Sequence, residues 1–168
     1  MEETLKELNQ LKKAGILRDY AIGGGYAVNY YLEPILTYDL DIYVLMYKDE
    51  EFSNLYRYLR AKGCEIENVH IIIGRMPVQF LPTYIHPAID EAVRKARRIR
   101  FRGIPTKVLT PEHLIATLLM AFRPKDRMVI PSLLEFTDKK KLQSTLRRFS
   151  DEKTPLDQRL RRILESLR

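Results

Sequence analysis

A run of three glycines and a pair of aspartates lie close together near the start of the chain, where Tyr20 to Tyr43 reads YAIGGGYAVNYYLEPILTYDLDIY. The apolar residues before the glycines predict a strand, and Tyr26–Leu32 predicts a short helix. Asp39–Met46 is apolar and rich in β-formers, which predicts the next strand. This segment is therefore expected to belong to an α/β domain in which a tight glycine turn joins a strand to a helix.

The two aspartates are separated by one residue. On a strand, Asp39 and Asp41 would project from the same face, roughly 7 Å apart along the backbone. Mg²⁺ prefers hard oxygen ligands and is commonly held by one or two carboxylates together with substrate phosphates, and Mn²⁺ accepts a similar set. The pair is therefore a candidate metal site, although such a pair on a strand also occurs as a solvated edge.

The glycine turn predicts an anion site. Without Cβ atoms at Gly23, Gly24 and Gly25, backbone N–H groups can approach a phosphate, and the start of the following helix adds favourable partial charge. A plain tight connection is the alternative. The order of glycine turn, helix and aspartate pair favours a metal-dependent phosphate site.

The stretch from Gly23 to Asp41 resembles the signature of the nucleotidyltransferase fold of polymerase-beta-like enzymes. Val108–Thr117 and Ala121–Arg127 are similar to the downstream helical segment of the toxin-like nucleotidyltransferases of the abortive-infection group. The resemblance covers about residues 15 to 136. It implies a nucleoside triphosphate substrate with Mg²⁺ or Mn²⁺ and transfer of a nucleoside monophosphate to an acceptor hydroxyl.

The resemblance also implies roles for individual residues. Asp39 and Asp41 would be catalytic and hold the metal, and Gly23, Gly24 and Gly25 would cradle the phosphates. Thr37 would support the aspartate strand. Apart from the resemblance, Lys125, Asp126 and Arg127 could contact a triphosphate from the helical side, and a structural salt bridge is the alternative. Enzymes of this fold commonly have a third carboxylate on a neighbouring strand. Gln79 stands in this third-ligand position. Its amide can coordinate a metal weakly or hydrogen-bond a ribose, but it cannot accept a proton as a carboxylate does.

The rest of the chain predicts a mixed sheet covered by helices and followed by a helical segment. Helices are expected at Glu3–Ala14, Glu50–Lys62 and Pro87–Ala96, and a hairpin at Glu67–Ile73 and Val78–Leu81. Ile104–Pro105 is expected to be a short connection. From the N-cap Thr110 the chain is expected to be almost entirely helical, with a final helix at Leu156–Leu167. We therefore expect an α/β core over residues 1–109 and a helical extension over 110–168, packed as one compact domain.

The formal net charge of +7 is unevenly distributed. Residues 1–90 carry 9 Lys and Arg against 13 Asp and Glu, whereas residues 91–168 carry 20 against 9. In Arg94–Arg102, strand alternation would place Arg98, Arg100 and Arg102 on one side. An RNA or protein acceptor could bind this basic second half, and an ordinary solvated face is the alternative.

The single cysteine, Cys64, excludes an internal disulfide and is interpreted as a packing residue. No apolar run is long enough to cross a membrane and the first residues are unlike a signal peptide, so a cytoplasmic protein is expected. His70, His86 and His113 lack the spacing of a metal motif and are interpreted as strand, cap and helix residues.

Two hypotheses follow. The first is a nucleotidyltransferase that uses Mg²⁺ and a nucleoside triphosphate. The second is a catalytically impaired module that binds a nucleotide or RNA, as one half of a pair similar to a toxin and its antitoxin. The sequence leaves the acceptor, the base preference and the oligomeric state open.

Overall fold

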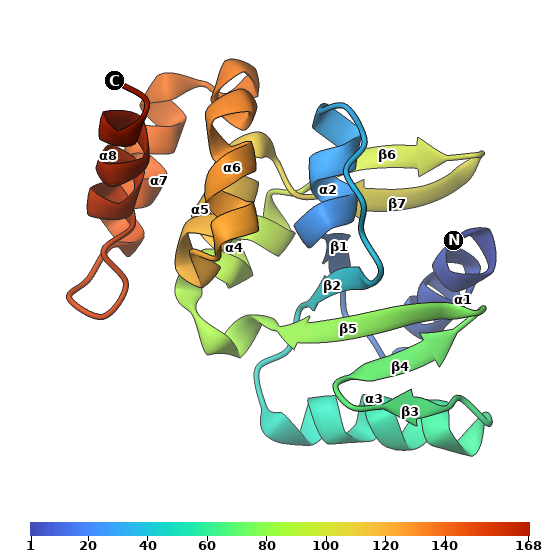
Figure 1. Cartoon of the computed structure of the whole chain (residues 1–168). Helices are drawn as coiled ribbons and strands as arrows, with labels where there is room; N and C mark the ends of the chain where they lie inside the picture. The colour runs from blue at the N-terminus through green and yellow to red at the C-terminus, as the bar shows by residue number, and fades with distance from the viewer.

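The computed structural model describes the whole chain, residues 1–168, and contains eight α-helices and one seven-stranded sheet. The strands are β1 Tyr20–Ile22, β2 Leu40–Val44, β3 Ile66–Glu67, β4 His70–Ile73, β5 Met76–Pro82, β6 Arg97–Phe101 and β7 Ile104–Val108. The helices are α1 Glu2–Lys13, α2 Gly24–Tyr31, α3 Asp49–Ala61, α4 Pro87–Arg94, α5 Pro111–Ala121, α6 Pro124–Leu133, α7 Lys139–Phe149 and α8 Leu156–Ser166. The expected class, a mixed sheet flanked by helices, is confirmed (Figure 1).

The strand directions bring the glycine turn and the aspartates together at the same end of the central strands β1 and β2. The strand order is β3-β4-β5-β2-β1-β7-β6. β1 pairs antiparallel with β2 and parallel with β7, and β2 pairs parallel with β5. Because β1 and β2 run in opposite directions, the end of β1 lies beside the start of β2.

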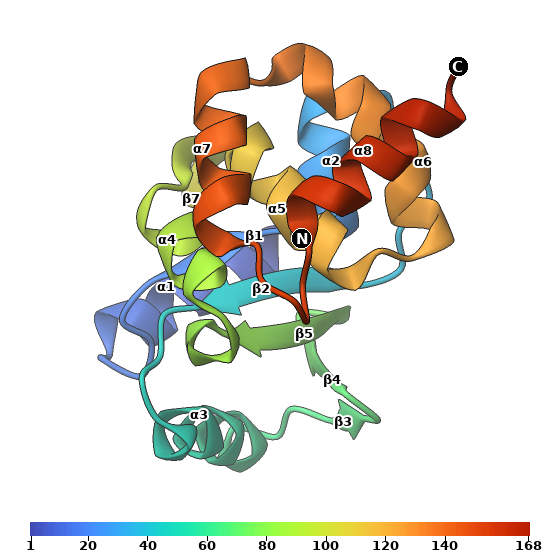
Figure 2. The same cartoon turned by 90° about the vertical axis from the view of Figure 1, so that its left-hand side faces the viewer.

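Alternation along β1 and β2 gives the sheet two different faces. Leu40, Ile42 and Val44 are fully buried and share one face with Tyr20 and Ile22. Helices α1 and α3 cover that face and contribute a row of leucines to the core: Leu5, Leu8, Leu11, Leu55 and Leu59. Asp41 and Tyr43 alternate with these residues and therefore point to the opposite face, on which α2 lies (Figure 2).

The C-terminal helices pack on the α2 side through α5, whose residues from Pro111 to Leu119 are all buried except Glu112. Thr110 caps this helix and Pro111 is its first residue, as expected. A charged network then joins α4, α5 and α7. The Glu91 carboxylate contacts His113 at 3.1 Å, Arg148 at 2.9 Å and Lys95 at 2.9 Å. Burial alone would raise the pKa of Glu91, but these hydrogen bonds lower it to about 2.

Two sequence-based expectations are wrong around residue 104. Ile104–Pro105 begins strand β7 instead of forming a connection, with Pro105 opposite Arg100. Arg102 lies in the turn, not in the strand, and has φ +47°. Arg102 and Gly103 both have positive φ and join β6 to β7 in two residues, which is the pattern of a type I′ hairpin. None of the helices is both long and apolar enough to cross a membrane.

Candidate functional site

The glycine turn connects the end of β1 directly to α2. The N–H of Gly23 donates to the carbonyl of Asp41 at 3.0 Å, so this glycine is tied to the strand that carries the aspartates. The carbonyl of Gly23 accepts the first helical hydrogen bond, from Ala27 at 3.2 Å. The N–H groups of Gly24 and Gly25 lie in the first turn, where the helix itself supplies no acceptor.

Close packing requires the absence of side chains at all three glycines. A Cβ on Gly24 would overlap the Asp41 carboxylate, and Gly24 also has φ +56°. A Cβ on Gly25 would lie 2.6 Å from the hydroxyl oxygen of Thr37, and one on Gly23 would overlap the Tyr43 ring. The turn thus holds Asp41 and Thr37 tightly. Phosphate contacts by the N–H groups of Gly24 and Gly25 stay a prediction.

The two aspartates occupy different backbone environments. Asp41 belongs to β2 and lies opposite Gln79 of β5. Asp39 lies one residue before β2, so only Asp41 stands within the strand ladder. Thr37 donates its hydroxyl hydrogen to the carbonyl of Asp39 at 3.2 Å. Thr37 is therefore placed to support the aspartate segment.

Asp41 is a carboxylate whose charge is poorly compensated. Burial, and then the neighbouring carboxylate of Asp39, raise the pKa of Asp41 to about 6. Arg123, Lys125 and His70 partly oppose this effect through their charges. A carboxylate in this situation is expected to favour a bound cation, because a cation removes the unfavourable interactions that raise the pKa.

His70 is a site residue that sequence reasoning missed. Its Nε2 lies 2.8 Å from Oδ2 of Asp39, and both side chains are about 30% exposed, at 29% and 30%. Pairing of Ile71 with Val78 places His70 beside Gln79, which is itself opposite Asp41. Asp41, Gln79 and His70 thus form a row across β2, β5 and β4. The hairpin register could have indicated this, since a two-residue turn at Gly74-Arg75 leads to the pairing of 70 with 79.

Helix α6 adds two cations to the same region. Lys125, expected at the site, and Arg123, which sequence reasoning missed, both act on the pKa of Asp41. Asp126 fixes Arg123, because its carboxylate accepts one hydrogen bond from the side-chain Nε of Arg123 at 2.8 Å and another from the backbone N–H of Arg123 at 3.0 Å. Asp126 is only 3% exposed. Its role is therefore structural, and it orients Arg123 beside the aspartates.

The tyrosine rings near the site differ in how far they are exposed to solvent. Tyr43 packs against Gly23, and the Tyr26 hydroxyl lies 3.8 Å from the sulfur of Met76. Tyr38, immediately before Asp39, is 78% exposed. Among Tyr26, Tyr38 and Tyr43, Tyr38 is therefore the one whose ring a nucleobase could reach freely.

The side chains present fit Mg²⁺ or Mn²⁺ better than a metal that needs a full protein cage. No group of three or more His, Cys, Asp or Glu side chains is arranged to hold a metal ion. Two carboxylates, one of them poorly compensated, suit an ion whose shell is completed by water and substrate phosphates. Asp39 and Asp41 are the residues that would hold it.

No protein-family model matches the sequence, and no curated protein sequence is similar to it. The structure is similar to an antigenic nucleotidyltransferase-like protein from Paracoccidioides brasiliensis, with TM-score 0.57 and 17% identity over 95% of this chain and 93% of that one. It is also similar to the solution structure of the antibiotic-resistance factor ANT(2'')-Ia, with TM-score 0.55 and 15% identity over 98% and 96% of the two chains. A crystal structure of ANT(2'')-Ia in complex with adenylyl-2''-tobramycin gives TM-score 0.53 and 16% identity over 86% and 95%.

These similarities extend over nearly the full length of each chain and concern the fold. The narrower likeness to the toxin-like group, inferred from Val108–Arg127, stays a prediction. The chain has the nucleotidyltransferase fold.

Proposed function

We propose that this protein binds a nucleoside triphosphate with Mg²⁺ or Mn²⁺ and transfers a nucleoside monophosphate to an acceptor hydroxyl. The observation that carries the proposal is the poorly compensated Asp41 carboxylate, packed against the glycine turn and next to Asp39. The similarity to ANT(2'')-Ia bound to an adenylylated antibiotic supports nucleotidyl transfer as the reaction class. The acceptor of this chain is a separate question, because fold does not determine it.

Each residue of the site has a role in this proposal. Asp39 and Asp41 would hold the metal, which when bound neutralises phosphate charge and orients the triphosphate. Arg123 and Lys125, at the start of α6, would contact phosphate oxygens from the other side. Gly24 and Gly25 would donate their N–H groups to the phosphates. The exposed ring of Tyr38 would stack on the base.

The proposed transfer exchanges one phosphorus–oxygen bond for another. The acceptor hydroxyl oxygen forms a bond to the α-phosphorus, the bond from that phosphorus to the bridging oxygen of the pyrophosphate breaks, and pyrophosphate leaves. The hydroxyl proton passes to solvent, since Gln79 cannot accept it. Catalysis then depends mainly on positioning and on charge stabilisation. The reaction is expected to be slow relative to enzymes with a third carboxylate.

Nucleotide binding is expected to raise the unfolding temperature only when the metal and both aspartates are present. Thermal unfolding would be followed with each of the four nucleoside triphosphates, with Mg²⁺, with Mn²⁺ and without metal. A ligand that binds only the native state must raise the transition temperature. Asp39→Asn combined with Asp41→Asn is expected to abolish the metal-dependent rise while the protein remains folded.

Glu50→Gln combined with Asp49→Asn is a matched control, since it removes two exposed carboxylates at the start of α3, away from the glycine turn. A rise that survives in the Asp39 and Asp41 variant would overturn the proposed site. Release of pyrophosphate from the bound nucleotide tests the chemical step. Binding without release would identify the alternative suggested by Gln79, a nucleotide-binding module that lacks the chemistry.

His70→Ala is expected to weaken metal-dependent nucleotide binding by about 10- to 100-fold, the range typical when a residue that orients a metal ligand is removed. The physical reason is that His70 fixes the Asp39 carboxylate at 2.8 Å. His70→Gln, whose amide can still donate to Asp39, should restore part of the affinity. Calorimetric titration with Mn²⁺ and the preferred nucleotide measures the affinity of both variants.

His86→Ala is the control for this variant. His86 caps α4 by accepting from the N–H of Ala88 at 3.1 Å, and this contact involves neither aspartate. The His86→Ala variant should be less stable than the unaltered chain but should bind the nucleotide with the same dissociation constant. If His70→Ala binds as tightly as the unaltered chain, the imidazole does not position Asp39.

A further inference from the structure

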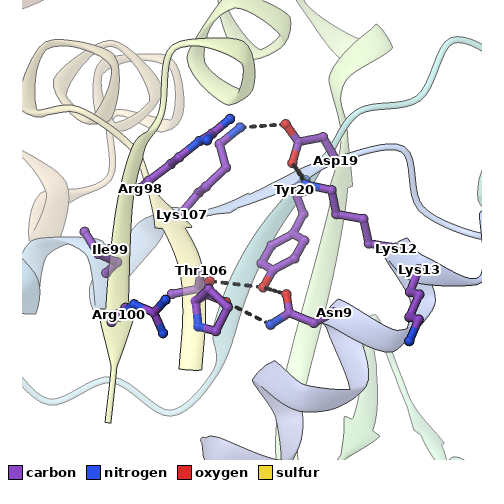
Figure 3. A pocket seen from close by; sticks show the side chains of 11 residues that line it. Asn9, Lys12, Lys13, Asp19, Tyr20, Arg98, Ile99, Arg100, Thr106 and Lys107 are labelled. Carbon is purple, nitrogen blue, oxygen red and sulfur yellow. Dashed lines mark hydrogen bonds and ion pairs between the residues drawn. The ribbon is translucent and has the colours of Figure 1, made fainter. Parts of the chain in front are cut away.

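A basic cleft lies at the opposite end of β1 from the glycine turn. It has a volume of about 840 Å³ and runs between α1 and the β6–β7 hairpin (Figure 3). Lys12 and Lys13 come from α1, and Arg98, Arg100 and Lys107 from the hairpin, whereas Asp19 is the only acid that lines it. Five cations therefore face one carboxylate, although none of these residues belongs to the candidate nucleotide site.

The cations of the cleft divide into two groups. Asp19 accepts from Lys12 at 3.0 Å and from Lys107 at 2.6 Å, and Lys107 also donates to the carbonyl of Val93 at 2.7 Å. These two lysines are held by the protein. Lys13, Arg98 and Arg100 are exposed, and none of them forms an ion pair. Three uncompensated charges thus remain on the rim.

The polar groups on the floor of the cleft already have hydrogen-bond partners within the protein. The Tyr20 hydroxyl lies 2.8 Å from Oδ1 of Asn9 and 3.1 Å from the Thr106 hydroxyl, and Asn9 donates to the carbonyl of Pro105 at 2.8 Å (Figure 3). No buried polar side-chain atom in the chain lacks a partner. A small ligand that needs several matched donors finds none free on this floor, and only two lining residues of the cleft are hydrophobic. Recognition would come from the charged rim.

We infer that this cleft binds the sugar–phosphate backbone of a nucleic acid strand. Exposed Lys and Arg side chains that form no ion pair are the groups that contact phosphates in sequence-independent binding. Of the three on the rim, Arg100 donates one hydrogen bond, to the carbonyl of Gly103 at 2.9 Å, and keeps its charge uncompensated. Arg98 and Arg100 are two residues apart on β6, an edge strand, and so lie on the same face at roughly 7 Å. Arg97, which alternates with Arg98 on β6, lies over the Tyr31 ring of α2 at 5.5 Å and is not part of this pair. The inference does not depend on the proposed nucleotidyl transfer.

The test is binding of short fluorescein-labelled single strands of RNA and of DNA, followed by fluorescence anisotropy between about 50 and 200 mM salt. The cleft variant combines Lys13→Gln, Arg98→Gln and Arg100→Gln. The matched control combines Arg147→Gln, Arg161→Gln and Arg162→Gln, three exposed arginines of α7 and α8 that form no ion pair, and changes the net charge equally. Circular dichroism checks that both variants fold.

The cleft variant is expected to bind at least 10-fold more weakly, whereas the control should change affinity less than 3-fold. Loss of three phosphate contacts should also make the slope of log K against log salt shallower by about 2. The difference between the RNA and DNA arms shows which backbone is preferred. Equal losses in the two variants would mean that net charge alone drives binding, and no binding to either strand would overturn the inference. Full competition by polyglutamate or by inorganic triphosphate at equal charge concentration would overturn it in favour of an acidic peptide or a small anion.

Discussion

Replacing Asp41 by Asn is expected to stabilise the protein in the absence of metal and nucleotide. The pKa of Asp41 is raised from 3.8 to about 6, mainly by burial, so the folded chain holds the ionised carboxylate less favourably than the unfolded chain does. A difference of this size corresponds to about 3 kcal/mol at full effect. Because the side chain is partly exposed, we expect a gain of about 1–2 kcal/mol at neutral pH, or about 2–8 °C in unfolding temperature.

The sign of the pH dependence follows from the raised pKa. Well below pH 3.8 the carboxyl is protonated in both states and imposes no penalty; the penalty grows as the pH rises from 3.8 toward 6 and is complete above it. The advantage of the Asn variant should therefore be present at about pH 7.5 and disappear at about pH 3. Guanidinium unfolding at both pH values measures it.

Asp39→Asn is the control for this prediction, since Asp39 contacts His70 and should give no comparable gain. An Asp41→Asn variant that is less stable at neutral pH, or equally shifted at both pH values, would contradict the argument. Together with the expected loss of metal-dependent binding, a gain would show that the carboxylate is retained at the expense of stability, as is common at functional sites.

The sequence predicted the parts of this molecule that depend on local pattern. The glycine turn, the helix after it and the aspartate strand follow from composition and periodicity over Tyr20–Tyr43. The helices at the end of the chain follow from the cap at Thr110 and the apolar stripes. The start of strand β7 is not predicted, because Pro105 indicates a break in the chain, whereas pairing with β6 holds this segment extended.

The missing site residues depend on tertiary contacts. His70 lies 31 residues from Asp39 and reaches it only because β4 and β5 place it in the row with Gln79. Spacing does not distinguish Arg123 from Lys125, because the burial of Asp126, which orients Arg123, arises only once α6 is packed. Neither the burial of Asp41 nor its pKa can be obtained from spacing. The uncompensated charge was therefore invisible in the sequence.

The roles of the three glycines also needed the structure. In the sequence they indicate an open cradle for phosphates, because glycine exposes backbone N–H groups. In the fold, the space beside each glycine is filled by a side chain of the same protein, from Tyr43, Asp41 or Thr37. Their first effect is to let the aspartate strand approach the turn.

Gly24→Ala is accordingly expected to destabilise the protein by about 2–5 kcal/mol. Alanine at φ +56° costs about 1–2 kcal/mol, and the overlap of its Cβ with the Asp41 carboxylate adds about 1–3 kcal/mol more. Gly63→Ala is the matched control, because Gly63 has φ +88° and nothing within 4 Å of the added Cβ. It should show the conformational cost alone.

The excess cost at Gly24 should depend on Asp41. In a chain that already carries Asp41→Ala, Gly24→Ala should cost about 1–2 kcal/mol, close to the value at Gly63, because the overlapping carboxylate is gone. Guanidinium unfolding of the four chains of this cycle gives the coupling energy directly. Equal costs at Gly24 and Gly63 in the unaltered background, or no coupling to Asp41, would show that the carboxylate can move away freely. It would then not be held by the turn, and the preorganised geometry on which the proposed metal site rests would be lost.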